Sequence, residues 1–155
     1  VCHNVAKFEE HEINGEQKKV CVHRKGATRS FAPGRMEIPE IYRETGQPVI
    51  IPGSMGTASY LLSGTTGAEQ LSFGSTGHGA GRIMSRNEAL HRFKGDKVMR
   101  DLKKMGIELM GTALKNVAEE APGAYKDVDD VVFVSHNSGM ANLVAKLAPL
   151  GVIKG

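Results

Sequence analysis

The sequence predicts an α+β fold, with a mixed sheet and hairpins in the first half and helices in the second. Turn signals and short apolar stretches dominate up to about residue 82, whereas apolar residues recur at helical spacing from about residue 85. The 155 residues, 40% hydrophobic and 24% charged, are enough to bury the core of one domain. We therefore expect residues 1–155 to form a single unit.

The first half opens on a hairpin signal. Asn14-Gly15 lies between two stretches in which polar and apolar residues alternate. The returning strand is expected over residues 19–23, with Val20 and Val22 on one face because side chains alternate along a strand. A basic loop over residues 23–29 is expected to follow.

Two further strand signals come before residue 74. Residues 48–52 predict a short apolar strand that is closed by proline. A second hairpin is then expected, with strands at residues 60–63 and 69–73 around a turn at residues 64–67.

The second half carries helix signals. Ser85 followed by Glu88 is a capping-box pattern, and a further helix restarts at Gly95-Asp96 and stops at Gly106. Within that helix, Val98, Leu102 and Met105 are expected on one face. Further helices are expected over residues 112–120 and 141–147, and residues 151–155 are expected to form an extended tail. Asp127 is a candidate cap for a segment through residues 131–134, which can be a helix or a strand.

Composition narrows the class of protein. Lys and Arg exceed Asp and Glu by 20 to 17, a mildly basic balance that is compatible with a nucleic-acid partner. No apolar run approaches the ~18–20 residues of a membrane span, so we expect no membrane association, and the first residues show no signal-peptide pattern. Two cysteines are too few for a disulfide scaffold, so a reducing, cytoplasmic location is expected.

The strongest local motif is the segment 77–82, Gly-His-Gly-Ala-Gly-Arg. Small neighbours leave both ring nitrogens of His78 approachable and let backbone N–H groups come close to phosphate oxygens. A neutral imidazole can attack phosphorus and later release the group to another acceptor. The alternative is a glycine-rich turn that carries an exposed histidine.

A second loop, residues 52–59, is rich in glycine and hydroxyl groups. Such a loop suits a phosphate or a base edge, although it matches neither the phosphate-binding Walker motif nor the dinucleotide fingerprint. A plain turn between strands is the alternative.

Two charged segments are candidate binding sites. His3-Asn4 with Glu9, Glu10 and His11 offers metal-binding side chains, or else a solvated network. Residues 23–29 suit a phosphate backbone, or else form a solvated basic face.

Taken in order, five segments closely resemble the C-terminal part of an RtcB-type RNA-splicing ligase of archaeal flavour. They are residues 2–4, 22–29, 51–56, 78–82 with 84–86, and 151–155. The resemblance spans nearly the whole chain, and the ordered series is far more specific than any single motif.

The resemblance implies an activity. Such ligases use GTP and Mn²⁺ to join RNA that ends in a 2′,3′-cyclic phosphate or 3′-phosphate to RNA with a 5′-hydroxyl, as in tRNA splicing. A histidine becomes guanylylated by GTP, GMP moves to the RNA 3′-phosphate, and the 5′-hydroxyl displaces it. The implied partners are RNA, as tRNA halves, an N-terminal ligase portion, and an archease-type activating protein.

It also implies roles for individual residues. His78 matches the guanylylated histidine, and His3 matches a Mn²⁺ ligand, with Asn4 beside it in the nucleotide site. Tyr125 resembles an aromatic residue that stacks on the base, and Lys154 matches a lysine that reaches the guanine. The guanylate loop and the backbone cradle are matched by Pro52, Gly53, Ser54, Met55, Ser59, Gly79, Ala80 and Gly81. By composition, RNA phosphate contacts are expected at Arg24, Lys25, Arg29 and Arg82.

The chain departs from the family in one respect. An Asp-Cys pair, an Asn-His motif and a further His, which lie in the family's N-terminal part, are not matched here, and His3 alone cannot hold catalytic manganese. We therefore expect half of a split ligase, a fragment, or a truncated inactive piece. Two alternatives remain open: a non-catalytic nucleotide- or RNA-binding module, and a phosphohydrolase with a histidine nucleophile.

Overall fold

The computed structural model describes residues 3–111 and 113–154, and the fold is α+β as the sequence predicts. The strands are β1 (Asn4–Ile13), β2 (Glu16–Lys25), β3 (Ala27–Arg29), β4 (Pro48–Ile51), β5 (Ser59–Gly64), β6 (Ser75–Gly77), β7 (Glu108–Gly111), β8 (Ala141–Leu147) and β9 (Gly151–Lys154). The α-helices are α1 (Thr66–Ser72), α2 (Arg86–Arg92), α3 (Gly95–Lys104), α4 (Leu114–Glu119) and α5 (Val128–Asn137), and two 3₁₀ turns are η1 (Glu40–Tyr42) and η2 (Pro122–Ala124).

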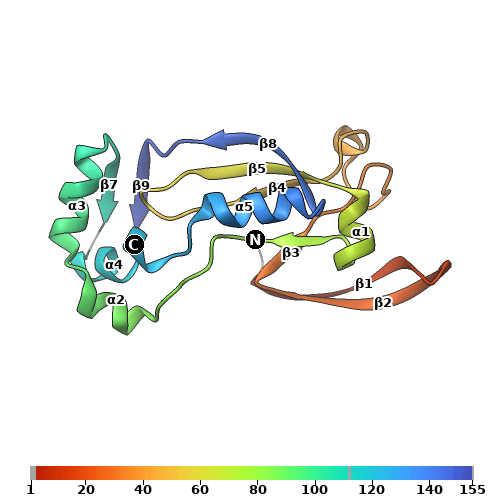
Figure 1. Cartoon of the computed structure of the whole chain (residues 1–155), viewed down its shortest axis with the longest axis horizontal. Coiled ribbons are helices and arrows are strands. Elements are labelled where there is room, and N and C mark those ends of the chain that lie inside the picture. Colours follow the sequence, from red (N-terminus) through yellow and green to blue (C-terminus); the bar gives the residue numbers. More distant parts are fainter. Residues whose placement is uncertain (1–2, 112, 155) are drawn as a thin grey trace.

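The centre of the molecule is an antiparallel sheet of order β4-β5-β8, with α5 lying along it (Figure 1). Alternate residues of β4 and β5 are buried, among them Ile51 and Leu62. On α5 the buried pair is Val128 and Val132, which are four residues apart and so share one helix face. This packing holds the ends of β4 and α5 close together, and both ends lead into the site described below.

A second apolar cluster lies at the end of the molecule formed by α2, α3, α4, β7 and β9 (Figure 1). The strands β7 and β9 pair in parallel. Val98 and Leu102 of α3 are buried there, as their helical spacing predicts. Met105 was expected on the same face but is 62% exposed, because α3 ends at Lys104 and Met105 only caps it.

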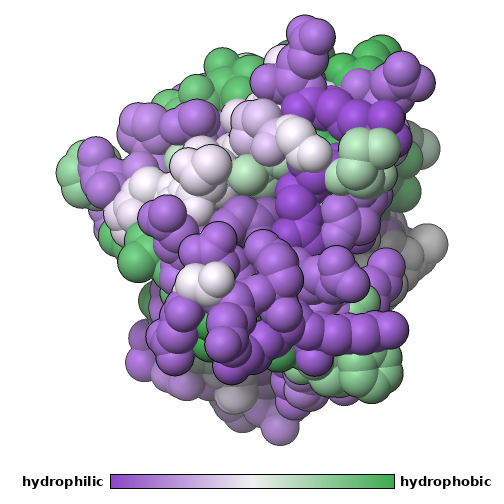
Figure 2. Space-filling model, turned by 90° about the vertical axis from the view of Figure 1, so that its right-hand side faces the viewer, coloured by the Kyte–Doolittle hydropathy of each residue, from purple (hydrophilic) through white to green (hydrophobic). Residues whose placement is uncertain are grey.

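The opposite end is the hairpin of β1 and β2 (Figure 1), and this sequence prediction is confirmed. Asn14 and Gly15 have φ values of 55° and 80°, the left-handed pair that a tight two-residue turn requires. Val20 and Val22 are half-buried on one face. Figure 2 looks onto this end of the molecule and shows a mostly hydrophilic surface.

Three other sequence predictions are wrong. Residues 66–72 form helix α1 instead of leading into a second hairpin, because the Thr65 hydroxyl accepts the Ala68 N–H at 3.1 Å and caps a helix. Residues 141–147 form strand β8 instead of a helix, because they pair with β5 across the sheet. The expected basic loop is absent, since residues 23–25 continue β2 and residues 27–29 form β3.

Two helix starts are confirmed. Ser85 Oγ accepts the Glu88 N–H at 3.1 Å and begins α2. Asp127 Oδ1 accepts the Asp129 N–H at 2.8 Å and begins α5, so residues 131–134 are helical. Among the described helices, none is long and apolar enough to cross a membrane.

Candidate functional site

Three loops that are far apart in sequence meet at one place: the loop after β4, the loop after β6 and the segment between η2 and α5. Backbone hydrogen bonds join them. The Ala80 N–H donates to the Pro52 carbonyl at 3.2 Å, and the Lys126 N–H donates to the Gly81 carbonyl at 2.9 Å. The structure therefore brings together the segments of both glycine-rich motifs.

His78 lies in the loop after β6 and is half-buried. Its ring meets the ring of His3 edge to face, with 4.6 Å between the ring centroids. Gly81 has φ of +76°, a backbone conformation that favours glycine, so the small residues after His78 serve the turn itself. The two histidines that the sequence placed in one site are thus in contact across 75 residues of chain.

Asn4 is fixed by a residue that sequence reasoning assigned only to the basic segment. The Nε2 of His23 donates to the Asn4 Oδ1 at 2.5 Å, across the paired strands β1 and β2. The amide of Asn4 is therefore oriented before any ligand arrives.

A pocket of about 230 Å³ opens beside these loops. Its lining residues are Gly53, Ser54, Met55, Glu120, Tyr125, Val152, Ile153 and Lys154. Five of the eight are residues that the sequence assigned to nucleotide binding. One of the five, Met55, also packs into the second apolar cluster. The candidate Ser59 does not line the pocket; it begins β5 and is half-buried.

The glycine in this pocket wall is required by its surroundings. A Cβ on Gly53 would lie 2.2 Å from the Ala58 carbonyl oxygen, because the loop doubles back on itself. The Ser54 N–H donates to Thr57 Oγ1 at 2.6 Å and holds that turn. The loop therefore presents its backbone to the pocket in a fixed conformation.

Glu120 is the pocket residue that sequence reasoning missed. Its carboxylate accepts the Tyr125 hydroxyl, and its oxygens lie 3.3 Å from Arg82 Nη1 and 3.8 Å from Lys154 Nζ. Burial alone would raise the pKa of Glu120, but the Tyr125 hydrogen bond and the neighbouring cations outweigh it, so its pKa is lowered. No motif marks Glu120, because Arg82 lies 38 residues away in the chain.

Tyr125 is held on two sides. Burial, followed by its hydrogen bond to Glu120, raises the pKa of its hydroxyl. The Arg82 guanidinium carbon lies 4.9 Å from the centroid of the Tyr125 ring, and Arg82 Nη2 donates to the Glu119 carbonyl at 2.6 Å. The aromatic wall of the pocket is therefore rigid.

Comparison with known proteins gives the family. The family model described as tRNA-splicing ligase RtcB matches residues 1–155. The chain belongs to the RtcB family. It is 57% identical over 155 residues to the tRNA-splicing ligase RtcB of Pyrococcus abyssi, 56% to that of Thermococcus kodakarensis, and 53% to the RNA-splicing ligase RtcB of Mycobacterium tuberculosis. All of this chain is covered, but only 17%, 32% and 35% of the respective relatives, so it spans about a third of their length or less.

The family membership confirms the resemblance, while the geometry corrects one predicted RNA contact. Arg24 is 2% exposed, its Nη1 and Nη2 donate to Glu9 at 2.6 and 2.8 Å, and its Nε donates to Ser75 Oγ at 2.8 Å. All three nitrogens are occupied inside the protein, so Arg24 serves the fold and is withdrawn as an RNA contact.

The other predicted RNA contacts differ in exposure. Arg29 is half-buried, donates to Gln47 at 3.0 Å and lies over the Phe31 ring. Arg82 is half-buried, and its Nη1 donates to the hydroxyl of the pocket residue Tyr125 at 3.1 Å. Lys25 is exposed at the end of β2, so its contact with an RNA phosphate stays a prediction.

The metal ligands expected of an RtcB protein are incomplete in the described part of this chain. In residues 3–111 and 113–154, no group of three or more His, Cys, Asp or Glu side chains is arranged to hold a metal ion. Glu9 and His11 are buried and bonded to each other at 3.1 Å. The residues present therefore do not form a manganese site by themselves, and His3, beside His78, is the one ligand that the resemblance assigns.

Proposed function

We propose that this chain carries the guanylate-binding and nucleotidyl-transfer part of a GTP- and Mn²⁺-dependent RNA ligase of tRNA splicing. The observation that carries the proposal is the pocket of Gly53, Ser54, Tyr125 and Lys154, whose loop is hydrogen-bonded to the loop of His78. RNA, as tRNA halves, is the proposed substrate.

The pocket chemistry supports a guanine base. A volume of about 230 Å³ is below the ~300–1,000 Å³ of sites that enclose a whole ligand, so it suits a base whose phosphates lie outside. The Tyr125 ring offers a stacking surface. The Lys154 ammonium only donates hydrogen bonds, so it fits the O6 acceptor of guanine and opposes the amino group that adenine has there.

His78 is the proposed nucleophile. A ring nitrogen attacks the α-phosphorus of GTP, a P–N bond forms, and the P–O bond to the departing pyrophosphate breaks. An oxygen of the RNA 3′-phosphate then attacks the same phosphorus, and the P–N bond breaks as the imidazole regains its nitrogen lone pair. The RNA 5′-hydroxyl finally displaces GMP to form the phosphodiester. Gly79, Ala80 and Gly81 place small residues next to the reacting nitrogen.

Manganese would supply neutralisation of phosphate charge. The remaining ligands are proposed to come from an N-terminal ligase portion, and an archease-type protein is a proposed activator. Cytoplasmic location likewise remains a prediction. A non-catalytic nucleotide- or RNA-binding role is the second candidate, and the incomplete metal-ligand set of the described residues favours it for the chain alone.

The test is covalent labelling by α-³²P-GTP, with Mn²⁺ and the N-terminal counterpart present. The label is expected on His78 and should be labile in acid and stable in base, as a phosphoramidate is. His78→Ala should abolish it, whereas His91→Ala, an exposed histidine of α2, should leave it unchanged. Undiminished labelling of His78→Ala would refute the assignment.

A further inference from the structure

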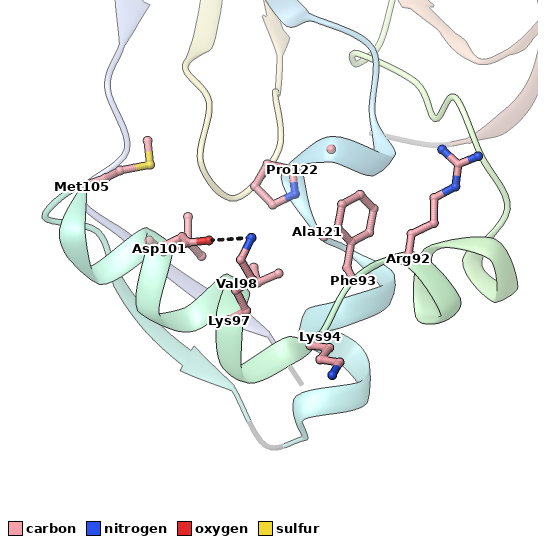
Figure 3. Close-up of a pocket in the computed structure, with 11 residues that line it drawn as sticks. Arg92, Phe93, Lys94, Lys97, Val98, Asp101, Met105, Ala121 and Pro122 are labelled. Atoms are coloured by element: carbon pink, nitrogen blue, oxygen red, sulfur yellow. Dashed lines mark ion pairs between the residues drawn. The ribbon is translucent and has the colours of Figure 1, made fainter.

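A second and larger cavity, of about 600 Å³, lies against η2, and the residues on either side of η2 include Glu120 and Tyr125 of the guanylate pocket. The two cavities share the segment 120–123 as a wall, since Glu120 lines one and Ala121, Pro122 and Gly123 line the other. None of the roles assigned above uses this cavity. Figure 3 shows the Phe93 ring across the cavity from Lys97, Val98 and Asp101 of α3, with Pro122 above.

The cavity adjoins a basic segment of the chain. Residues 86–104 carry seven Lys or Arg and three Asp or Glu, a net charge of +4. The whole chain carries +3, so the remaining residues sum to −1. The rim of the cavity includes three of these cations, Arg92, Lys94 and Lys97, and all three are exposed. These exposed cations suit an anionic partner.

The apolar interior adds a flat aromatic surface. The Phe93 ring rests on Gly123, where a Cβ would lie 2.8 Å from the ring carbon Cζ. Glycine at this position therefore creates the room that the ring occupies. Phe93 follows the last residue of α2 and is half-buried, so the ring is held in place while it lines the cavity.

One carboxylate faces the same cavity, and its charge is balanced. Asp101 lies 3.8 Å from Lys97 Nζ and 3.7 Å from Lys104 Nζ. Arg92 is likewise paired with Glu88 at 2.7 Å. Among the described residues, no carboxylate pairs with Lys94, so this ammonium is available to a phosphate.

We propose that this cavity is a nucleotide subsite for the RNA strand, with a base against Phe93 and the flanking phosphates on Lys94, Lys97 and Arg92. A flat apolar ring beside a row of exposed cations suits the alternation of base and phosphate in single-stranded RNA. An acidic peptide would use the cations but not the flat ring. The inference rests on the proposed function, because RNA is the anionic chain that the proposed ligase handles, and the shared wall keeps the strand next to the guanylate pocket.

The experiment measures binding of a short, unstructured, fluorescein-labelled RNA with a 3′-phosphate, at several salt concentrations. Phe93→Ala should weaken binding by about 5- to 100-fold, the loss expected for one stacked base. Phe93→Leu, which keeps an apolar side chain and guards against misfolding, should weaken it in the same direction. Phe133→Leu, at a 68% exposed phenylalanine of α5, is the matched control and should bind as the parent does.

A charge variant separates the phosphate contact from the base contact. Lys94→Ala should reduce the slope of log affinity against log salt concentration by about 0.7, the value for one phosphate contact on a single strand. Lys18→Ala, in the hairpin at the other end of the molecule, should leave the slope unchanged. RNA carrying 5-iodouridine should cross-link by light to a peptide that contains Phe93.

The outcomes distinguish this inference from the proposed function. RNA binding that is equal in the parent, Phe93→Leu and Lys94→Ala would overturn the subsite, as would cross-links only outside residues 92–105 and 121–123. Binding of no RNA by a parent chain that is still labelled by GTP would overturn the subsite and leave the proposed function standing. The effect of the Phe93 variants on RNA affinity is thus measured independently of the labelling of His78 by GTP.

Discussion

Two clusters of charged side chains lie near opposite ends of this molecule, and each is built around one carboxylate (Figure 1). The first carboxylate is Glu9 in the hairpin, and the second is Glu120 beside the guanylate pocket. In both clusters burial alone would raise the pKa of the carboxyl, and in both the cationic and hydrogen-bonding partners outweigh it and lower the pKa. The pairing chemistry is therefore similar, and the difference lies in what surrounds each pair.

The Glu9 cluster is buried, with Glu9, His11 and Arg24 each at most 7% exposed. Arg24 holds Glu9 through two nitrogens, and the ring nitrogens of the buried His11 lie 3.1 Å from Glu9 and 3.3 Å from Glu69. Its members bind one another and the backbone carbonyl of Phe73, to which Arg24 donates at 2.8 Å. Such a cluster fixes the hairpin on the rest of the protein.

The Glu120 cluster is open on one side. Its partners Tyr125 and Lys154 both line the pocket, so the donors that Glu120 orients also face the space for a ligand. Comparing the two clusters teaches that burial of the cation, rather than the residue types, separates a structural ion pair from a binding site. The following predictions test that distinction.

The largest expected effect is on stability, at Arg24. Arg24→Met removes the buried arginine and leaves Glu9 with His11 as its remaining side-chain partner, which costs about 3–5 kcal/mol in the free energy of unfolding. Chemical denaturation measures the change. Lys25→Met, the exposed neighbour, should stay within about 0.5 kcal/mol of the parent. A change of less than about 1 kcal/mol for Arg24→Met would show that the buried Glu9 cluster does not hold the fold.

A smaller effect is expected on ionisation, at Glu120. Because the hydrogen bond to this carboxylate helps to raise the pKa of Tyr125, Glu120→Gln should lower that pKa towards its ordinary value of about 10. Ultraviolet absorbance of tyrosinate during an alkaline titration measures it, helped by the absence of tryptophan. Tyr125→Phe assigns the transition among the three tyrosines. An unchanged titration of Tyr125 in Glu120→Gln would mean that the carboxylate does not control the pocket wall.

The sequence predicted the elements whose signals are local. The Asn14-Gly15 turn and the Ser85 cap each act within a few residues, so both are recognisable without a structure. Strand β8 was missed because its pairing with β5 joins segments about 80 residues apart. Helix α1 was missed although its Thr65 cap is as local as the Ser85 cap, because the two glycines that flank Thr65-Thr66 also predict a turn.

In the candidate site, too, contacts between distant segments could not be predicted from local sequence patterns. His3 and His78 could be placed together only by family resemblance, since their ring contact spans the chain. Glu120 carries no motif, and the burial of Arg24 depends on Glu9 and Ser75, which no local pattern connects to it. In the candidate site, long-range contacts therefore account both for the residue that sequence reasoning missed, Glu120, and for the RNA contact that it wrongly assigned, Arg24.

The most direct test of the open pocket is its preference between GMP and AMP, measured by calorimetry on the parent chain, Lys154→Met and Lys25→Met. The parent is expected to bind GMP about 10- to 100-fold more tightly than AMP, because a charged donor at O6 is worth about 1.5–3 kcal/mol. Lys154→Met should lose that preference, and Lys25→Met should keep it. Equal affinity of the parent for both nucleotides, or a preference that survives Lys154→Met, would contradict the assignment of this pocket to guanine.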